Sequence, residues 1–170
     1  MTKINNISII VAMGLNGEIG ANNEMLWNIK EEMKLFRETT TGNTIIMGRK
    51  TAESLPKGYL PNRRNIVIST GENTMLKPLS DCVEETNSIQ KAIELCSVDE
   101  KIFIIGGASI YEQMFHLADT LIISEIQNFY DNADKFFPTK RFDLEYNLIS
   151  EQIYDTEPKF IRKIYTRKIK

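Results

Sequence analysis

The chain has 170 residues and a mass of 19.6 kDa, and 42% of its residues are hydrophobic. A chain of this length can bury a core without disulfides or a structural metal, so we expect one domain over residues 1–170. The formal net charge of −2 at pH 7 excludes the strongly basic balance that is typical of nucleic-acid and membrane-surface binding, and favours a small-molecule partner.

The first apolar run and the scarce cysteines and histidines limit the compartment and the chemistry. Residues 7–13 are apolar but too short to span a membrane, and no cleavage site follows them. Cys82 and Cys96 are too few for a disulfide scaffold, and the single histidine, His116, excludes a metal centre of several imidazoles. We expect a cytoplasmic monomer with buried structural thiols, no metal site and no chemistry at His116.

Short apolar runs alternate with helical patterns along most of the chain. Strands are predicted at 7–13, 44–47, 65–69, 101–105 and 120–126. Helices are predicted between them at 29–40, 50–55, 88–96 and 109–117. Apolar runs without period-two alternation suit strands that are covered on both faces, as in a mostly parallel sheet. The pattern therefore predicts an α/β fold.

The pattern changes after Pro138. Segments 144–153 and 160–169 predict two longer strands with a turn between them, and the absence of an intervening helix predicts an antiparallel pair. The second of these segments and its flanks are rich in basic residues, namely Lys159, Arg162, Lys163, Arg167, Lys168 and Lys170. They could bind a polyanion, but on a terminal edge strand we interpret them as a solvated face that discourages edge-to-edge pairing.

The helix predicted at 29–40 carries an acid on its apolar stripe. Four residues occupy positions i, i+3, i+4 and i+7 and so share one helical face: Ile29, Glu32, Met33 and Phe36. Apolar surroundings raise the pKa of a carboxyl, so Glu32 is a candidate general acid or a fixed acceptor for a cationic ligand. An ion pair with a basic residue elsewhere in the fold would explain the same pattern.

Two strand ends lead through glycines into a helix. One is Gly48-Arg49-Lys50-Thr51 and the other is Gly106-Gly107-Ala108-Ser109. Glycines and exposed N–H groups at a helix start let a phosphate approach the backbone. Neither stretch is a complete nucleotide-binding motif, and a glycine pair can be only a tight turn. Two such ends in one small α/β chain indicate a dinucleotide at the carboxyl ends of the strands.

These residues occur together and in order, and through them the sequence resembles the dihydrofolate reductase family. Residues 14–27 resemble the family's mobile active-site loop. The match continues through Glu32, Phe36, residues 46–51, Glu53-Ser54, Leu60-Pro61, residues 63–65, 105–108 and 110–113, and Phe137-Pro138, so it covers almost the whole chain.

The resemblance implies a single dihydrofolate reductase-like domain. Its mixed, mostly parallel twisted sheet would have about eight strands, about four flanking helices and a C-terminal antiparallel hairpin. It also implies an oxidoreductase that converts 7,8-dihydrofolate to tetrahydrofolate with NADPH, by hydride transfer to pterin C6. Such an enzyme supports one-carbon, thymidylate and purine synthesis and is an antifolate target.

For the substrate, the resemblance implies that Glu32 binds the 2-amino group and N3 of the pterin and promotes protonation of N5. Trp27 would hold an ordered water, the Ser124 hydroxyl would connect to the carboxylate, and Tyr111 would lie beside the nicotinamide. Apolar walls would come from Ile10, Ala12, Met33, Phe36, Leu55 and Ile105. Arg63 would clamp the α-carboxylate of the glutamate tail, whereas without the family we would interpret Arg63 and Arg64 as a solvated pair.

For the cofactor, the resemblance implies that Arg49 and Lys50, with Ser69 and Thr70, receive the adenosine 2′-phosphate. Two adjacent cations favour NADPH over NADH. The pyrophosphate would bind to Gly106, Gly107, Ala108 and Ser109, and Thr51 would bind the other phosphate oxygens; the bond between the two glycines is cis in the family. The other expected cofactor contacts are Ala12, Ile19, Gly20, Gly48, Ile110 and Tyr111. Closure of residues 14–25, with hinges at Gly14, Gly17 and Gly20, would exclude water.

Four positions differ from the pattern common among bacterial members: Leu26, Lys30, Ala52 and Ser124. None of them removes a group that the reaction needs, and Ser124 keeps the hydroxyl. Two alternatives stay open. A pyrimidine reductase of riboflavin synthesis would share the fold and the NADPH side but would not need Trp27, Glu32 and Arg63. A non-catalytic nucleotide- or folate-binding module descended from the enzyme is the other.

Overall fold

The computed structural model describes residues 6–22, 24–70, 80–139 and 142–169. One sheet contains β1 (Ile7–Met13), β3 (Thr44–Gly48), β4 (Arg64–Ile68), β5 (Val83–Thr86), β6 (Ile102–Ile104), β7 (Thr120–Ile126), β9 (Tyr146–Tyr154) and β10 (Phe160–Arg167). A separate ribbon pairs β2 (Glu18–Gly20) with β8 (Lys135–Phe136). The helices are α1 (Lys30–Thr40), α2 (Arg49–Ser54), α3 (Ile89–Glu94), α4 (Ala108–Met114) and α5 (Phe142–Glu145).

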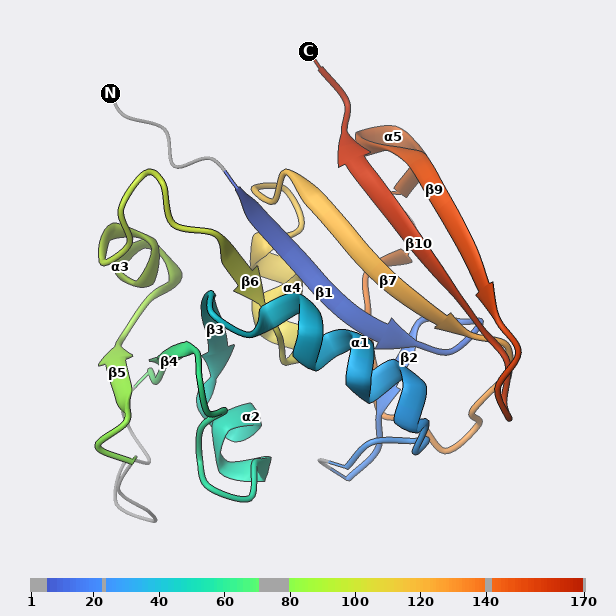
Figure 1. The fold of residues 1–170 in the computed structure, drawn as a ribbon, viewed down its shortest axis with the longest axis horizontal. Coiled ribbons are helices and arrows are strands. Elements are labelled where there is room, and N and C mark those ends of the chain that lie inside the picture. The colour runs from blue at the N-terminus through green and yellow to red at the C-terminus, as the bar shows by residue number, and fades with distance from the viewer. Residues whose placement is uncertain (1–5, 23, 71–79, 140–141, 170) are drawn as a thin grey trace.

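The strand order of the large sheet is β5-β4-β3-β6-β1-β7-β10-β9 (Figure 1). The pairs from β5 to β7 are all parallel, whereas β10 runs antiparallel to both β7 and β9. This confirms the predicted α/β class, the mostly parallel sheet and the C-terminal antiparallel hairpin. No helix in the described part of the chain is long and apolar enough to cross a membrane.

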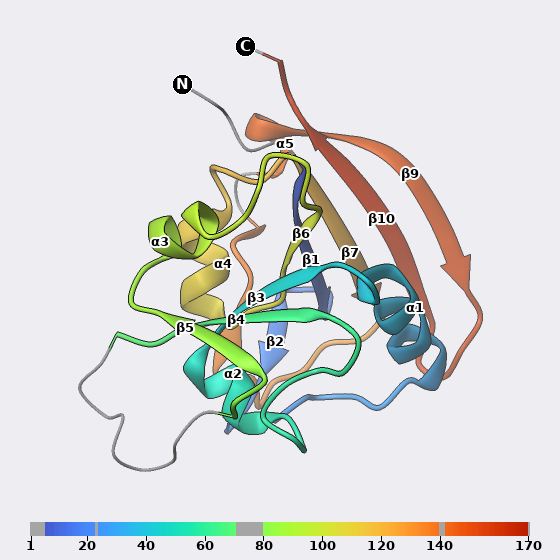
Figure 2. The same cartoon turned by 60° about the vertical axis from the view of Figure 1, so that its left-hand side comes forward.

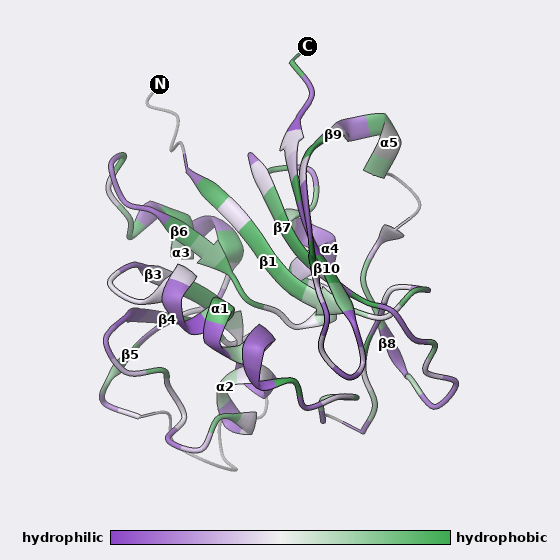
Figure 3. Cartoon of the chain, turned by 45° about the vertical axis from the view of Figure 1, so that its right-hand side comes forward, coloured by the Kyte–Doolittle hydropathy of each residue, from purple (hydrophilic) through white to green (hydrophobic). Residues whose placement is uncertain are grey.

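The central strand β1 is buried on both faces because helices cover both sides of the sheet. Ile9 packs in a cluster with residues of α3 and α4, and Ile10 packs in a second cluster with Phe36 of α1. Helices α1 and α4 lie on opposite faces (Figures 1 and 2). Figure 3 shows β1 and β7 hydrophobic along most of their length. Each fully buried isoleucine contributes about 1.5–3 kcal/mol to stability, so this double layer explains the unbroken apolar runs.

Helix α1 ends with two threonines, Thr39 and Thr40, whose hydroxyls bond both to the helix and to side chains from elsewhere in the chain. The Thr39 and Thr40 hydroxyls donate to the carbonyl oxygens of Leu35 and Phe36, at 2.6 Å and 2.9 Å. Such bonds compete with the helical backbone pattern, in agreement with the end of the helix here. Both hydroxyl oxygens also accept a hydrogen bond from an arginine on another element.

The structure corrects several predicted boundaries. Short strands β2, β5 and β8 were not predicted, because they lack a long apolar run. The strand expected at 144–153 begins only at Tyr146, after the short helix α5. Cys96 is buried as expected, but Cys82 is exposed. His116 lies just beyond α4, where its Nδ1 is 2.8 Å from Glu145 Oε1.

The interpretation of the basic cluster as an edge-strand face is wrong. β9 is the edge strand, and β10 pairs on both sides. The Lys163 ammonium lies 3.1 Å from Glu125 Oε2, and the Arg167 guanidinium donates to two main-chain oxygens at 2.7 Å and 2.8 Å. The Arg162 side chain donates to Thr39 Oγ1 at 2.9 Å. Side chains of a strand alternate between the two faces of the sheet, and on β10 these three meet partners there.

Candidate active site

The acid on α1, Glu32, is buried, with only 6% of its surface exposed. Burial raises the pKa of its carboxyl, while a hydrogen bond from Ser124 and the charge of Arg162 act against this, and the net pKa is raised. Ser124 on β7 lies opposite Arg162 on β10, so both groups reach Glu32 from neighbouring strands. A carboxyl with a raised pKa is better suited to proton transfer near neutral pH than an ordinary one.

Trp27 lies in a cluster that borders the same region of the sheet. Its ring packs against Tyr130, with centroids 5.3 Å apart, and only 9% of the residue is exposed. Among the described residues, Trp27 Nε1 is the one buried side-chain nitrogen or oxygen without a hydrogen-bond partner. A buried N–H group without an acceptor is costly, so this atom is suited to hold a water or a ligand atom.

Tyr111 connects the acid's surroundings to the glycine turn that follows β6. Its hydroxyl donates to the Ile10 carbonyl oxygen at 3.0 Å, and the residue is buried. Burial and the nearby charge of Glu32 raise the pKa of the phenol. A Cβ atom on Gly106 would lie 3.2–3.3 Å from the Tyr111 ring and hydroxyl, so the glycine allows this close contact.

The structure brings together most of the residues that were predicted to form the apolar wall. Ile10, Phe36, Leu55 and Ile105 belong to one cluster on the α1 face of the sheet, and Ala12 packs in the cluster of Trp27. Met33 differs, because 51% of it is exposed. Successive helical positions are turned by about 100°, so with Glu32 directed inward Met33 lies at the rim of the wall.

Arg63 lies at the C-terminal end of α1, where a second cation is close. Its Nη1 donates to Thr40 Oγ1 at 3.0 Å and its Nε donates to the Pro61 carbonyl oxygen at 2.8 Å. Burial and the like charge of Arg37 lower the pKa of the guanidinium. Arg63 is thus partly buried and hydrogen-bonded within the chain, unlike a side chain that contacts only water, and two neighbouring guanidinium groups favour a bound anion.

The glycines at the two strand ends form a close backbone contact. Gly48 N donates to the Gly106 carbonyl oxygen at 2.8 Å, and the Gly106–Gly107 peptide bond is cis. A Cβ atom on Gly48 would lie 3.3 Å from Ile110, and one on Gly107 would lie 3.5 Å from Thr51 Oγ1. The predicted phosphate-binding residues of both strand ends are thus brought together, with open backbone between them.

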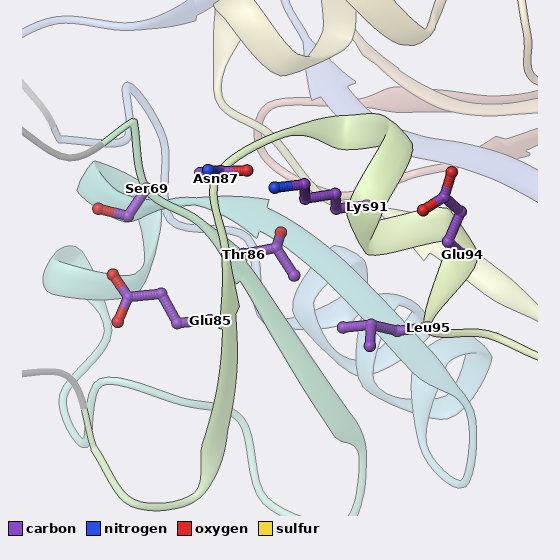
Figure 4. Close-up of a pocket in the computed structure, with 7 residues that line it drawn as sticks. All are labelled: Ser69, Glu85, Thr86, Asn87, Lys91, Glu94 and Leu95. Atoms are coloured by element: carbon purple, nitrogen blue, oxygen red, sulfur yellow. The ribbon is translucent and has the colours of Figure 1, made fainter.

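An open groove of about 620 Å³ lies beside the ends of β4 and β5 and along α3 (Figure 4). It is lined by Ser69, Glu85, Thr86, Asn87, Lys91, Glu94 and Leu95. Ser69 and Glu85 are at one end of the groove and Glu94 is at the other. Arg49 Nη1 is 3.4 Å from Ser69 Oγ and 3.8 Å from Glu85 Oε1, and its Nε donates to Glu53 Oε1 at 2.8 Å.

The other predicted cofactor residues are dispersed around these points. Lys50, Thr70 and Ser109 are exposed, and Ala108 is partly buried at the start of α4. Ile110 is directed into the core, so it contributes packing beside Gly48. Ile19 packs against the same core, and Gly20 lies against the Glu24 main chain, where a Cβ atom would be 3.3 Å from the carbonyl oxygen.

Three charged residues near the site were not predicted from the sequence. Arg162 acts on Glu32, Arg37 acts on Arg63, and Glu85 lies beside Arg49. Arg37 follows Met33 by one helical turn, so its helical spacing was available as a signal. Arg162 and Glu85 lie on strands, and their neighbours depend on sheet register, which sequence patterns do not provide.

Comparisons with known proteins all identify the same family. A family model described as dihydrofolate reductase matches residues 6–168. The dihydrofolate reductase of Bacillus subtilis (strain 168) is 36% identical over 132 residues, which are 78% of this chain and 75% of that protein. The enzyme of Neisseria gonorrhoeae is 43% identical over 132 residues, 78% of each chain. That of Ureaplasma parvum serovar 3 is 35% identical over 162 residues, 95% of this chain and 97% of its own.

A solved structure shows the same fold. Dihydrofolate reductase from Enterococcus faecalis complexed with NADP(H) and RAB-propyl superimposes with a TM-score of 0.82. The superposition covers 96% of each chain at 23% sequence identity. The likeness extends from the parallel sheet through the C-terminal hairpin.

Proposed function

Because this chain belongs to the dihydrofolate reductase family, we propose that it reduces 7,8-dihydrofolate to 5,6,7,8-tetrahydrofolate with NADPH as the reductant. The observation that carries this proposal is the buried acid Glu32 beside an apolar wall, on the face of the sheet that leads to the glycine turn. Bound NADPH supplies the hydride, which goes to pterin C6.

In this proposal Glu32 performs the proton chemistry. Its carboxylate binds the 2-amino group and N3 of the pterin and promotes protonation of N5. The raised pKa, caused mainly by burial, supports this role, because it makes the carboxyl easier to protonate than an ordinary glutamate. Ser124 orients the carboxylate, and Trp27 Nε1 binds an ordered water in the buried region where it lacks a partner.

The apolar wall and Arg63 bind the rest of the substrate. Ile10, Phe36, Leu55 and Ile105 contact the pterin and the aminobenzoyl ring and exclude water, with Ala12 and Met33 at the margins. Arg63 binds the α-carboxylate of the glutamate tail through its planar guanidinium. The like charge of Arg37 supports an anion at this place.

The residues of the two glycine-bearing strand ends fit the cofactor. Gly48, Gly106 and Gly107 leave the backbone open, and Thr51 lies beside them for phosphate oxygens. Arg49 and Ser69, with Lys50 and Thr70 nearby, bind the 2′-phosphate at the end of the groove. Tyr111, packed on Gly106, orders the nicotinamide next to the pterin. We further propose that the chain acts as a single-domain monomer in the cytoplasm.

The test is oxidation of NADPH by the purified protein, followed by the loss of the absorbance of the reduced nicotinamide. We expect oxidation that depends on added dihydrofolate and that is slower with NADH. Binding of NADPH without oxidation in the presence of dihydrofolate would contradict the proposed reaction. A control reaction with a riboflavin-pathway pyrimidine substrate should show no turnover, and turnover there would favour the alternative enzyme.

A further inference from the structure

A second buried acid, Glu18 on β2, is not used by the proposed chemistry. Only 2% of its surface is exposed. Among the described residues, Glu18 and Glu32 are the two buried acids. Glu18 belongs to the small ribbon of β2 and β8, where it lies opposite Phe136. A buried carboxyl is costly unless its oxygens accept hydrogen bonds, so its partners reveal what it does.

Both carboxylate oxygens of Glu18 accept hydrogen bonds from the main chain of two different turns. Oε1 accepts from Asn16 N at 2.5 Å, and Oε2 accepts from Tyr130 N at 2.6 Å. The two donors are far apart in sequence but are bridged by one side chain. A buried side chain that accepts a hydrogen bond from the backbone of each segment holds the two segments at a fixed separation, so this bridge constrains both.

The turns are also packed closely around the carboxylate. A Cβ atom on Gly14 would lie 2.9 Å from Glu18 Oε1 and 2.9 Å from the Tyr130 ring, so only glycine fits there. Gly14 N donates to the Glu18 carbonyl oxygen at 2.9 Å, and Leu15 N donates to the Asn128 carbonyl oxygen at 3.0 Å. Main chain, glycine and carboxylate therefore join residues 14–18 to residues 128–130.

Tyr130 carries this constraint to the candidate active site, because its ring packs on Trp27. We propose that Glu18 is a positioning residue whose buried carboxylate joins the 14–18 turn to the 128–130 turn and, through Tyr130, fixes Trp27. Residues that touch a ligand need such support from a neighbouring shell to hold their geometry. In this proposal Gly14 serves the packing of a fixed turn, and any hinge of the loop lies beyond Glu18.

The test uses Glu18→Gln, which keeps the size of the side chain. Because the new amide presents an NH2 group to one backbone N–H, one of the two bridging bonds is lost. Trp27 is the chain's single tryptophan, so its fluorescence reports on this position alone. Glu24→Gln is the matched control, since Glu24 lies in the same loop and is exposed.

For folded Glu18→Gln we expect acrylamide to quench Trp27 at least about twice as efficiently as in the wild type, with no change for Glu24→Gln. We also expect kcat for NADPH-dependent reduction of dihydrofolate to fall about fivefold with little change in KM. The kinetic result rests on the proposed function, whereas the fluorescence result does not. A lowered unfolding temperature with unchanged quenching in the native protein would overturn the proposal.

A second measurement covers the case in which Glu18→Gln does not fold. In the wild-type protein, hydrogen exchange of the Asn16 and Tyr130 amides should be at least about 100-fold slower than in an unfolded chain. Asn16 is itself exposed in a turn, so protection of its amide is expected only from the Glu18 carboxylate. Rapid exchange at both amides would overturn the proposal.

Discussion

The two ends of the candidate site place their charged groups in different surroundings. At the acid end, Glu32 and Ser124 are buried, and the guanidinium of Arg162 is partly buried beside them. At the groove end, Glu85 is half exposed and Lys50 is exposed, whereas the Arg49 side chain that meets Glu85 is only 14% exposed. The acid end therefore depends mainly on desolvation, whereas at the groove end water and salt reach the charges around Arg49 and screen them.

This difference predicts which single substitutions should change activity or stability most. A buried group has few alternatives, because no water replaces a lost partner, so its removal should have a large and specific effect. Exposed charges are individually weak and partly replaceable, so their removal should have small effects that depend on ionic strength. The predictions below test this contrast in order of expected size.

The largest effect is expected for Glu32→Gln. If Glu32 promotes protonation as proposed, its replacement should lower kcat at neutral pH about 100-fold or more, because proton transfer contributes about 100–10,000-fold. Binding of NADPH, measured by fluorescence titration, should change little. The matched control is Glu31→Gln, which alters the neighbouring and more exposed acid of α1 and should leave turnover near that of the wild type. Nearly full activity of Glu32→Gln would contradict the larger effect that we expect at the buried acid.

The same substitution should stabilise the fold at neutral pH. Because the folded-state pKa of Glu32 is raised above its usual value of 4.5, the folded protein is most favoured when the carboxyl is protonated. The stability of the wild type that depends on protonated Glu32 is fully present below pH 4.5, and it is lost as the pH rises through the folded-state pKa. Denaturant unfolding should therefore show Glu32→Gln to be more stable than the wild type at neutral pH, with the difference vanishing toward pH 4.5.

The next largest effect is expected for Gly106→Ala. Gly106 has φ +119°, and a Cβ atom would lie 3.2 Å from the Tyr111 hydroxyl. Backbone strain of this kind costs about 1–3 kcal/mol, and displacement of Tyr111 should also lower kcat. Gly42→Ala is the matched control, because Gly42 has φ +82° but nothing within 4 Å of the new atom. Equal losses of stability and activity in both variants would contradict a special role for the Tyr111 contact.

At the groove end we expect a smaller and cofactor-specific effect for Arg49→Gln. Loss of one charge-assisted contact to the 2′-phosphate should raise KM for NADPH about tenfold, with KM for NADH unchanged. The ratio of the two KM values, measured at low salt, is the readout. The same increase of KM for both cofactors would show that Arg49 supports the structure of the groove and does not recognise the 2′-phosphate.

The smallest effect is expected for Glu85→Gln, and its sign is opposite. Glu85 Oε1 lies 3.8 Å from Arg49 Nη1, so its charge competes with a phosphate for that cation. Ion pairs with an exposed partner contribute about 0.2–1 kcal/mol, which corresponds to a decrease of about 1.4-fold to fivefold in KM for NADPH. The decrease should disappear at high salt and be absent with NADH. A salt-independent change would show that packing, not charge, is responsible.

Local patterns were sufficient for much of the fold and for one end of the site. The apolar runs at 7–13 and 120–126 lie in the structure as β1 and β7, because burial on both faces requires uninterrupted apolar residues. The helical spacing around Glu32 placed the acid on the inner face of α1. The roles proposed for Trp27 and Arg63 come from the resemblance to the family, because spacing alone did not indicate them.

Pairings between distant segments were not available from local patterns. The strand containing Arg162 was expected at the sheet edge, yet it lies between β7 and β9, which brings the guanidinium toward Glu32. Met33 shares the apolar period of α1 but is mostly exposed, because the width of the buried stripe is set by what packs against it.

The sequence by itself determined the α/β alternation, the acid on the apolar stripe and the glycines at two strand ends, because these depend on residues close together in the chain. Only the tertiary structure decided which charges surround Glu32 and Arg49, and that Glu18 bridges two turns. Strand order and register bring those partners together. They follow from the packing of the whole chain, which no local period records.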